Sequence, residues 1–350
     1  MAYTTINNPE LYFQTKLYTG NDSSNAITLD GDANMQPDLI WIKNRGDGQN
    51  SFVVDSVRGA SVYLETDSDD VDTSASGAFT SFNSDGFTLT GSGGRQNANS
   101  HTYVAWCWNT QGGSGTSNTS GTTNTTSTSV GQTQGFSIST YTGTGSAATI
   151  GHGLGAAPEV IIVKKRTPSD DHWFNYHKVI GNGKRLLLSN NVAEATSSSY
   201  WADTTPSSTV YSVSTNGGNN ESSHTYVAYC WRSIQGFSKM GDYTGTGNVN
   251  GAFVYTGFKP AMVIIKGNNT ENWHIYDNKR DVGNPTDQAL QPNSPSQTEF
   301  TETNVLDFLS NGFKLGVSGS GHNGSGVQYI YMAWAEAPLV NSNGVPTTAK

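Results

Sequence analysis

One strand-like segment recurs along the chain and limits what it can fold into. Residues 101–108 read HTYVAWCW and residues 224–231 read HTYVAYCW. We align a third copy with residues 329–336, YIYMAWAE, which places Trp334 with Trp106 and Glu336 with Trp108. Aromatic and β-branched residues dominate all three, as in β-strands. Each copy closes a unit of about a hundred residues, so the sequence predicts three internal repeats.

Each unit also carries an apolar run between a proline and a lysine. The three segments are PDLIWIK at 37–43, PEVIIVK at 158–164 and PAMVIIK at 260–266, and each follows a Tyr-Thr-Gly triplet at 18–20, 141–143 or 243–245. The runs do not alternate between apolar and polar residues, so both faces of these strands are predicted to be covered. One face must meet the unit's own core. The other is predicted to meet a second sheet, a neighbouring repeat or another subunit.

Further strand and turn signals complete the unit. Aromatic strands are expected at 51–55, 172–176 and 272–276, and hairpins at Ser84-Asp85-Gly86 and Ser310-Asn311-Gly312. Short strands separated by frequent turn residues are typical of β-sandwiches. The predicted fold class is all-β, with three tandem sandwiches of lectin-like or jelly-roll-like type and almost no helix.

The repeats divide the chain into six segments. They are an N-terminal arm at 1–11, with a short helical turn after Asn8; repeat 1 at 12–109; a Gly/Ser/Thr-rich segment at 110–134; repeat 2 at 135–232; repeat 3 at 236–340; and an exposed tail at 341–350. The composition of 110–134 is typical of a flexible linker, although it could also be ordered. Repeats 2 and 3 must pack closely because only residues 232–235 join them.

Composition and charge exclude some classes of function. Charged residues make up 13% of the chain, against about 25% in ordinary globular domains. The net charge is −9 with no basic stripe, so we expect no nucleic-acid partner. No signal peptide or membrane span is recognisable. The cysteines Cys107 and Cys230 occupy the same repeat position, and are expected to be buried and unpaired, although a disulfide is an alternative.

The sequence contains no recognisable catalytic or metal-binding motif, so we predict no enzyme, no cofactor and no metal. The acidic stretch at 65–72, ETDSDDVD, is expected to be a solvated loop, with Ca²⁺ binding as the open alternative. Paired carboxylates of a glycan-cleaving enzyme are set by distance in the fold and leave no local motif, but no acidic residue recurs in all three repeats. Histidines 101 and 224 are repeat equivalents, and His172, His177 and His274 lie near the aromatic strands without strong ligand spacing.

Most tryptophans are explained by the repeat. Trp41 aligns with Ile162 and Ile264, which makes it a core residue, while Trp108 is expected to be partly exposed because Glu336 replaces it in the third copy. Tyr200 and Trp201 have no equivalent in the other repeats. The sequence therefore predicts that this aromatic pair is the best candidate for binding an external ligand, with local packing as the alternative.

These motifs together resemble a known family. The segments PDLIWIKNR at 37–45, DSVRG at 55–59, GHGLG at 151–155 and GVP at 344–346, together with the closing strand, resemble repeat modules in virion structural and tail-fibre-like proteins of tailed bacteriophages, especially marine ones. The resemblance covers nearly the whole chain. It implies a virion protein that is assembled in the host cytoplasm, with other virion proteins and a host-surface glycan or protein as partners.

Two expectations about assembly and role follow. The two-faced apolar runs predict a homo-oligomer, with a trimer favoured, although the three repeats could instead form a pseudo-threefold ring within one chain. For function, a tail-fibre or tail-associated protein that contacts the host competes with a capsid decoration or a fibre or tail adaptor of purely architectural role. Three similar modules would suit multivalent contact.

Overall fold

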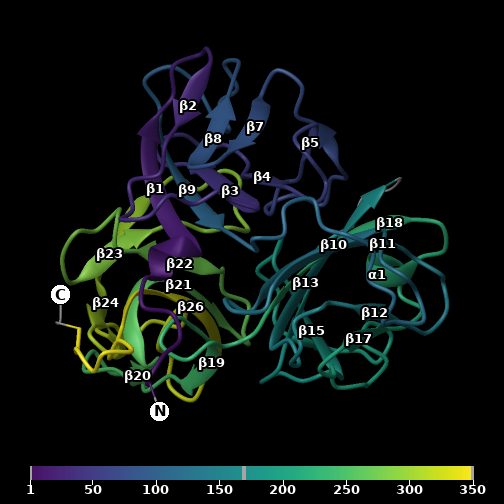
Figure 1. Cartoon of the computed structure of the whole chain (residues 1–350). Helices are drawn as coiled ribbons and strands as arrows, with labels where there is room; N and C mark the ends of the chain where they lie inside the picture. The colour runs from purple at the N-terminus through teal and green to yellow at the C-terminus, as the bar shows by residue number, and fades with distance from the viewer. Residues whose placement is uncertain (1, 168–170, 348–350) are drawn as a thin grey trace.

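The computed structural model describes residues 2–167 and 171–347, and it is built almost wholly of strands (Figure 1). In these residues the helical segments are η1 (Pro9–Leu11) and α1 (Gly217–Asn220). The predicted turn after Asn8 is confirmed as η1, because the Asn8 side chain accepts a hydrogen bond from the Glu10 backbone N–H at 3.0 Å. The prediction of an all-β fold is confirmed. No helix in the described residues is long and apolar enough to cross a membrane.

Three units share one sheet plan, and Figure 1 shows them as three lobes around a common centre. Each inner sheet is antiparallel and places the opening strand beside the closing strand, then the lysine strand, then the aromatic strand. In repeat 1 these strands are β1 (Phe13–Thr19), β9 (Thr102–Trp108), β3 (Leu39–Asn44) and β4 (Phe52–Asp55). In repeat 2 they are β11 (Phe136–Thr142), β18 (Thr225–Trp231), β13 (Val160–Thr167) and β14 (Trp173–His177). In repeat 3 they are β19 (Ser238–Thr244), β26 (Gln328–Pro338), β21 (Phe258–Gly267) and β22 (His274–Asp277).

Outer strands cover one face of each inner sheet. Repeat 1 has β2 (Asn25–Ile27), β8 (Gly86–Leu89) and β7 (Phe79–Asn83), with the pair β5 (Val62–Tyr63) and β6 (Thr73–Ser74). Repeat 2 has β12 (Ala148–Gly151) and β17 (Val210–Val213), and its inner sheet is extended by β10 (Ser127–Gly131), β15 (Lys184–Leu187) and β16 (Ala195–Thr196). Repeat 3 has β20 (Phe253–Tyr255), β25 (Gly312–Leu315), β24 (Phe300–Leu309) and β23 (Thr286–Ala289). The hairpins predicted at Asp85-Gly86 and Asn311-Gly312 join β7 to β8 and β24 to β25.

The strand register corrects our alignment of the third closing strand. In every repeat the tyrosine of Tyr-Thr-Gly pairs with, and stacks on, a tyrosine of the closing strand at 5.0–5.1 Å between ring centroids; the pairs are Tyr18–Tyr103, Tyr141–Tyr226 and Tyr243–Tyr329. Tyr329 is therefore the equivalent of Tyr103, two residues away from our alignment. As a result Trp334 is the equivalent of Trp108 and Trp231, and Ala333, not Ala335, stands at the cysteine position. A two-residue shift keeps the same side chains on the same face of a strand, so alternation alone could not detect it.

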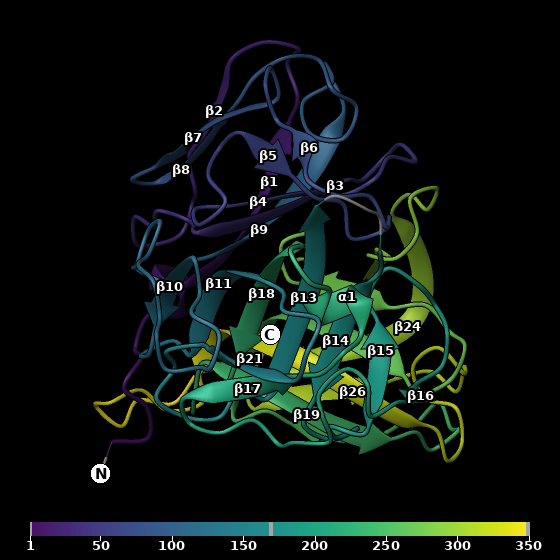
Figure 2. The same ribbon diagram turned by 90° about the vertical axis from the view of Figure 1, so that its right-hand side faces the viewer.

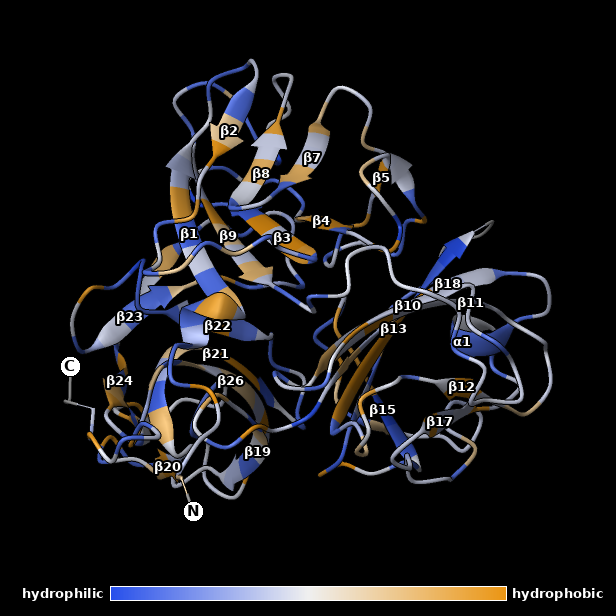
Figure 3. Ribbon diagram, in the orientation of Figure 1, coloured by the Kyte–Doolittle hydropathy of each residue, from blue (hydrophilic) through white to orange (hydrophobic). Residues whose placement is uncertain are grey.

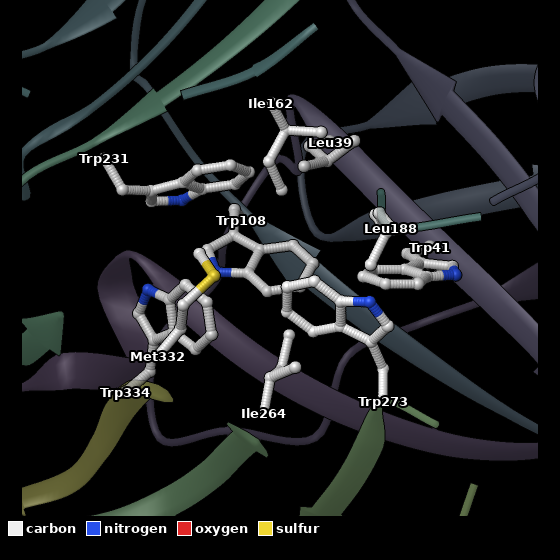
Figure 4. Close-up of a pocket in the computed structure, with 10 residues that line it drawn as sticks. All are labelled: Leu39, Trp41, Trp108, Ile162, Leu188, Trp231, Ile264, Trp273, Met332 and Trp334. Carbon is white, nitrogen blue, oxygen red and sulfur yellow. The ribbon is translucent and has the colours of Figure 1, made fainter. Parts of the chain in front are cut away.

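The three equivalent tryptophans meet at the centre of the molecule. Their ring centroids lie 5.2 Å apart for Trp108–Trp334, 6.2 Å for Trp231–Trp334 and 6.4 Å for Trp108–Trp231, each in an edge-to-face arrangement (Figure 4). A cavity of about 20 Å³ with only apolar lining remains between them and the neighbouring side chains. The expectation that Trp108 is partly exposed is wrong, since its exposed fraction is 2%. Aromatic edge-to-face contacts add to the burial of these large side chains and hold the three inner sheets together.

This central core explains why the apolar runs do not alternate. In repeat 1, Ile40 and Ile42 point into the sandwich of their own repeat, whereas Leu39 and Trp41 point into the core shared by all three repeats. The orange inner strands in Figure 3 converge on this centre. We predicted that the second face of each apolar run meets a second sheet, a neighbouring repeat or another subunit. In the structure it meets the neighbouring repeats. The runs therefore give no reason to expect a homotrimer, because one chain covers them by itself.

Polar contacts between the repeats follow the same threefold cycle. The Trp173 indole N–H in repeat 2 donates to the Glu65 carbonyl in repeat 1 at 2.7 Å, and the Trp273 indole N–H in repeat 3 donates to the Leu187 carbonyl in repeat 2 at 2.8 Å. Thr66 in repeat 1 completes the cycle, because its hydroxyl donates to the Pro292 carbonyl in repeat 3 at 2.8 Å. Each repeat thus donates a side-chain hydrogen bond to a backbone carbonyl of the preceding one.

The segment 110–134 is ordered, so its interpretation as a flexible linker is wrong. Its residues 127–131 form β10, which adds an edge strand to the sheet of repeat 2, as Figure 2 shows. Threonine and serine hydroxyls bind one another along it, as in Thr128 Oγ1–Ser139 Oγ at 3.1 Å. Threonine is a good strand former, and its hydroxyl can pair across strands, which composition alone did not distinguish from a mobile linker.

The two ends of the chain lie together on repeat 3. The Tyr3 hydroxyl donates to the Gly257 carbonyl at 2.8 Å, and the Thr347 backbone N–H donates to the Leu339 carbonyl at 2.9 Å. The Asn7 amide joins the two ends by donating to the Ser342 hydroxyl at 2.7 Å. Residues 340–346 turn back on themselves through a bridge between Val340 and Pro346. Within the described residues up to 347, the predicted exposed tail is thus held by the Asn7–Ser342 hydrogen bond and by the Val340–Pro346 bridge.

Candidate functional site

The aromatic pair selected from the sequence lies inside repeat 2. Tyr200 is 9% exposed and Trp201 is 2% exposed. Tyr200 packs on Phe174 with ring centroids 4.7 Å apart, and Trp201 meets Tyr176 edge-on at 5.8 Å. The structure therefore supports local packing, which was the alternative, and the prediction of an external contact through these two side chains is wrong.

The acidic stretch at 65–72 is also less exposed than predicted. Glu65, Thr66 and Asp67 are buried, whereas Asp69 and Asp70 are exposed. Asp67 forms a buried ion pair with Lys43 at 2.7 Å, and its carboxylate also accepts from the Ser51 backbone N–H at 3.0 Å. Because these protein groups already neutralise its charge, Asp67 is a structural residue of repeat 1, and a solvated loop describes only the middle of the stretch.

Asp72, at the end of this stretch, belongs to the contact between repeats 1 and 2. Its carboxylate binds Arg58 of its own repeat at 3.0 Å and Arg166 of repeat 2 at 2.7 Å. The two cations occupy both oxygens of the carboxylate. This side chain therefore holds repeats together and is not free to bind Ca²⁺.

Comparison of the repeats identifies a better candidate. One position of the aromatic strand, which faces the inside of the sandwich, is equivalent in the three repeats. It is held by Phe52, Phe174 and His274, which pair with Ile42, Val163 and Ile265 of the lysine strands. A second equivalent position is occupied by Gln96, Asn219 and His322. In each repeat the backbone carbonyl of this residue accepts a hydrogen bond from the hydroxyl of the Tyr-Thr-Gly tyrosine. Repeat 3 alone places a histidine at both positions.

In the three repeats the space beside these positions differs. In repeat 1 it is an open groove of about 350 Å³ bordered by Phe52 and Gln96. In repeat 2, Tyr200 occupies it by packing on Phe174, and its carbonyl accepts from the Asn219 amide at 2.9 Å. In repeat 3 a wider groove of about 560 Å³ has Glu302 and His322 in its wall.

Three side chains that can bind cations meet at the wall of this third groove. One ring nitrogen of His274, one of His322 and a carboxylate oxygen of Glu302 all lie within 4.8 Å of one another. His274 comes from β22, Glu302 from β24 and His322 from the loop before β26. The strand β24 has ten residues, whereas β7 of repeat 1 has five, and its additional residues carry Glu302 over β22.

Burial determines the charge of these groups. His274 and His322 are 4% and 5% exposed, whereas the Glu302 side chain is 27% exposed. Burial lowers the pKa of His274 to about 4 and lowers the pKa of His322 well below its usual value, so both imidazoles are neutral at pH 7. Burial also raises the pKa of Glu302.

A tyrosine connects the carboxylate and one imidazole. The Tyr276 hydroxyl donates to Glu302 Oε2 and lies 2.7 Å from His322 Nε2, and the distance from His322 Nε2 to Glu302 Oε2 is 3.5 Å. The rings of His274 and His322 are 4.2 Å apart between centroids. The arrangement is compact and polar, and it borders a groove that is open to solvent.

The sequence carried a weak signal for this cluster that we did not use. His274 stands where the other repeats have phenylalanine, and His322 precedes an asparagine that all three repeats share, as Asn97, Asn220 and Asn323. A pair of histidines that breaks the repeat pattern at two interior positions is such a signal. It could not be recognised without the correct register, because residues 274 and 322 are 48 positions apart.

Comparisons with known proteins give a family without a function. A family model described as a domain of unknown function, DUF7483, matches residues 8–338. No curated protein and no solved structure matches the chain. The matched span runs from the cap of η1 to the last residue of β26, so the three repeats are matched together as one unit.

Proposed function

This chain belongs to the DUF7483 family, whose description names no function, and we propose that it is a non-enzymatic virion structural protein of a tailed bacteriophage. In this proposal it is a tail-fibre or tail-associated component that contacts the host surface. The motifs described above support the virion role through their resemblance to phage structural modules. The structure adds a rigid body whose three repeats are fixed to one another and differ on their outer sides.

The observation that carries the host contact is the groove of repeat 3. Equivalent sites of the three repeats have diverged, to an open groove in repeat 1, a filled one in repeat 2 and the widest one in repeat 3. Val249 stands at the rim of the repeat 3 groove and is 68% exposed. A concave site with apolar and polar walls suits a small ligand such as a sugar or a peptide loop. Because the site of repeat 2 is filled, the three repeats of one chain do not offer three equal binding sites. Multivalent contact with the host would come from several copies of the chain on one particle.

One substitution tests this contact. Replacing Val249 with arginine places a long charged side chain at the rim of the groove, so binding of the purified protein to host cells should fall. Val282→Arg is the matched control, because Val282 is 84% exposed and does not line the groove. Equal binding by both variants and the unchanged protein would reject this groove as the host contact.

A purely architectural role is the second candidate, as a capsid decoration or as a fibre or tail adaptor. It is favoured by the N-terminal arm, since the Tyr3 hydroxyl donates to the Gly257 carbonyl at 2.8 Å and Thr4 binds Gln235. An arm bound to its own repeat 3 is not extended toward a fibre shaft. Labelling of intact virions with antibody against this chain separates the two roles: labelling of the tail tip or fibres supports host contact, and labelling of the capsid lattice overturns it.

A further inference from the structure

We propose that His274, Glu302 and His322 bind a divalent transition-metal ion of the Zn²⁺ type, with a remaining coordination position that faces the groove of repeat 3. Two imidazoles and one carboxylate are ligands that Zn²⁺ accepts in proteins, and they leave a fourth position for water or for a ligand atom. This cluster would bind the ion whether or not the groove contacts a host.

The distances suit an ion of this size. Zn²⁺ binds imidazole nitrogen and carboxylate oxygen at roughly 2.0–2.2 Å, so two ligand atoms at a tetrahedral angle lie about 3.3–3.5 Å apart. His322 Nε2 and Glu302 Oε2 are 3.5 Å apart. With all three ligand atoms within 4.8 Å of one another, the His274 ring needs an adjustment on the order of 1 Å to complete the set.

The polar contacts of His274 are weak for a buried imidazole. The residue is 4% exposed, and its ring contacts the Asn272 backbone without a well-formed hydrogen bond at Nδ1. Buried polar atoms nearly always have well-formed partners. A metal ion bound by this nitrogen would provide a stronger one.

Ion binding changes the hydrogen bonds around the ligands. The Tyr276 hydroxyl contacts Glu302 Oε2 and His322 Nε2, the two atoms that the ion would bind, so the ion takes the place of this hydroxyl between them. The Gln291 amide nitrogen lies 3.2 Å from His274 Nε2, and a neutral imidazole that binds metal through Nδ1 carries its proton on Nε2. Gln291 must therefore turn its amide oxygen toward the ring, because the outer partner of a metal-bound histidine accepts from its other N–H.

The chain also contains two versions of the same site without the ligands. Repeat 1 has Phe52 and Gln96 at the two histidine positions, and repeat 2 has Phe174 and Asn219. The sandwich therefore folds without histidines at these positions. Their joint presence in repeat 3, beside a carboxylate carried by a lengthened strand, is not explained by packing.

The test measures metal uptake by the full-length chain after any purification tag has been removed. Titration with Zn²⁺ in a calorimeter, and metal analysis after dialysis, should show one ion per chain. His274→Phe and His322→Gln insert the residues of repeat 1, so the fold should survive while the affinity falls by at least ~100-fold. Glu302→Gln keeps the shape of a partly exposed side chain, removes its charge and should also weaken binding.

The control is His224→Gln in repeat 2. His224 Nε2 lies 3.6 Å from Glu221 near the surface, and this pair represents adventitious binding by an ordinary His–Glu contact. The control should bind Zn²⁺ like the unchanged protein. Absence of stoichiometric binding in the unchanged protein would overturn the proposal, and so would equal affinity in the His274, Glu302 and His322 variants. Binding that is lost in the His224 variant would place the ion elsewhere and reject the site.

Discussion

Arg58 is the side chain whose replacement tests most directly how the repeats are joined. Its guanidinium is fully buried between repeats 1 and 2 and binds the carboxylates of Asp55 at 2.5 Å and Asp72 at 3.0 Å. It also donates to the Val53 carbonyl at 3.0 Å and to the Tyr229 hydroxyl of repeat 2 at 3.3 Å. Replacing Arg58 with isoleucine removes every one of these bonds and leaves Asp55 with a buried, uncompensated charge.

The expected loss follows from that uncompensated charge. Removing one partner of a buried ion pair costs roughly 3–5 kcal/mol of unfolding free energy. Urea unfolding, followed by tryptophan fluorescence and by circular dichroism, measures this loss and shows whether the three repeats still unfold together. A loss below about 1 kcal/mol would refute the reasoning, because a surface ion pair has that value.

A matched variant comes from the chain's own repeat 2. In repeat 2 the positions of Asp55 and Arg58 are occupied by His177 and Ile180. Tyr229 of repeat 2 faces the pair in repeat 1, and the equivalent Met332 of repeat 3 faces the pair in repeat 2. The triple variant Asp55→His, Arg58→Ile, Tyr229→Met reproduces that arrangement without charges, while Asp72 keeps Arg166 at 2.7 Å. The triple variant removes both charges of the buried pair and so leaves no uncompensated carboxylate, and it should therefore be more stable than Arg58→Ile alone. A triple variant less stable than the single one would contradict this explanation of the repeats.

The remaining predictions concern the core and the response to acid. Trp334→Ala should lower the unfolding free energy by about 3–5 kcal/mol, because it opens a cavity at the centre of the three repeats; a change under 1 kcal/mol in urea unfolding would show that the centre is loosely packed. Trp201→Ala should destabilise by a similar amount and leave the amount of host-cell binding per folded molecule unchanged, whereas a selective loss of binding would restore the surface interpretation. Gly218→Ala should be destabilising in thermal unfolding, since a Cβ there would lie 2.1 Å from the Phe174 ring. Burial lowers the pKa of His152 from 6.5 to about 4, so the stability that its neutral form contributes is complete above pH 6.5 and is lost as the pH falls toward 4. His152→Gln should therefore flatten the pH dependence of the unfolding free energy between these values. An unchanged slope would exclude His152 as its source.

Local sequence determined the strands, the turns and the class of fold. The aromatic closing strands, the apolar runs before Lys43, Lys164 and Lys266, and the Asp-Gly and Asn-Gly hairpins depend on propensities and spacing over fewer than about ten residues, which are visible in the chain itself. The sequence also indicated that both faces of each apolar run are buried, because apolar and polar residues do not alternate there. It did not indicate whether a second sheet, a neighbouring repeat or another subunit buries the second face, since each would give the same pattern.

Tertiary structure decided the contacts that local patterns do not encode. The central contact of Trp108, Trp231 and Trp334 depends on a register in which a shift of two residues preserves the pattern of faces. Whether Tyr200 is a surface or a core residue depends on whether the space beside Phe174 is filled, and this space differs among the repeats although their strands are equivalent. The meeting of His274, Glu302 and His322 requires three separate segments to converge on one groove. Periodicity reports the surroundings of a residue along its own strand, whereas a site is made of distances between strands, and those are fixed only when the sheets pack.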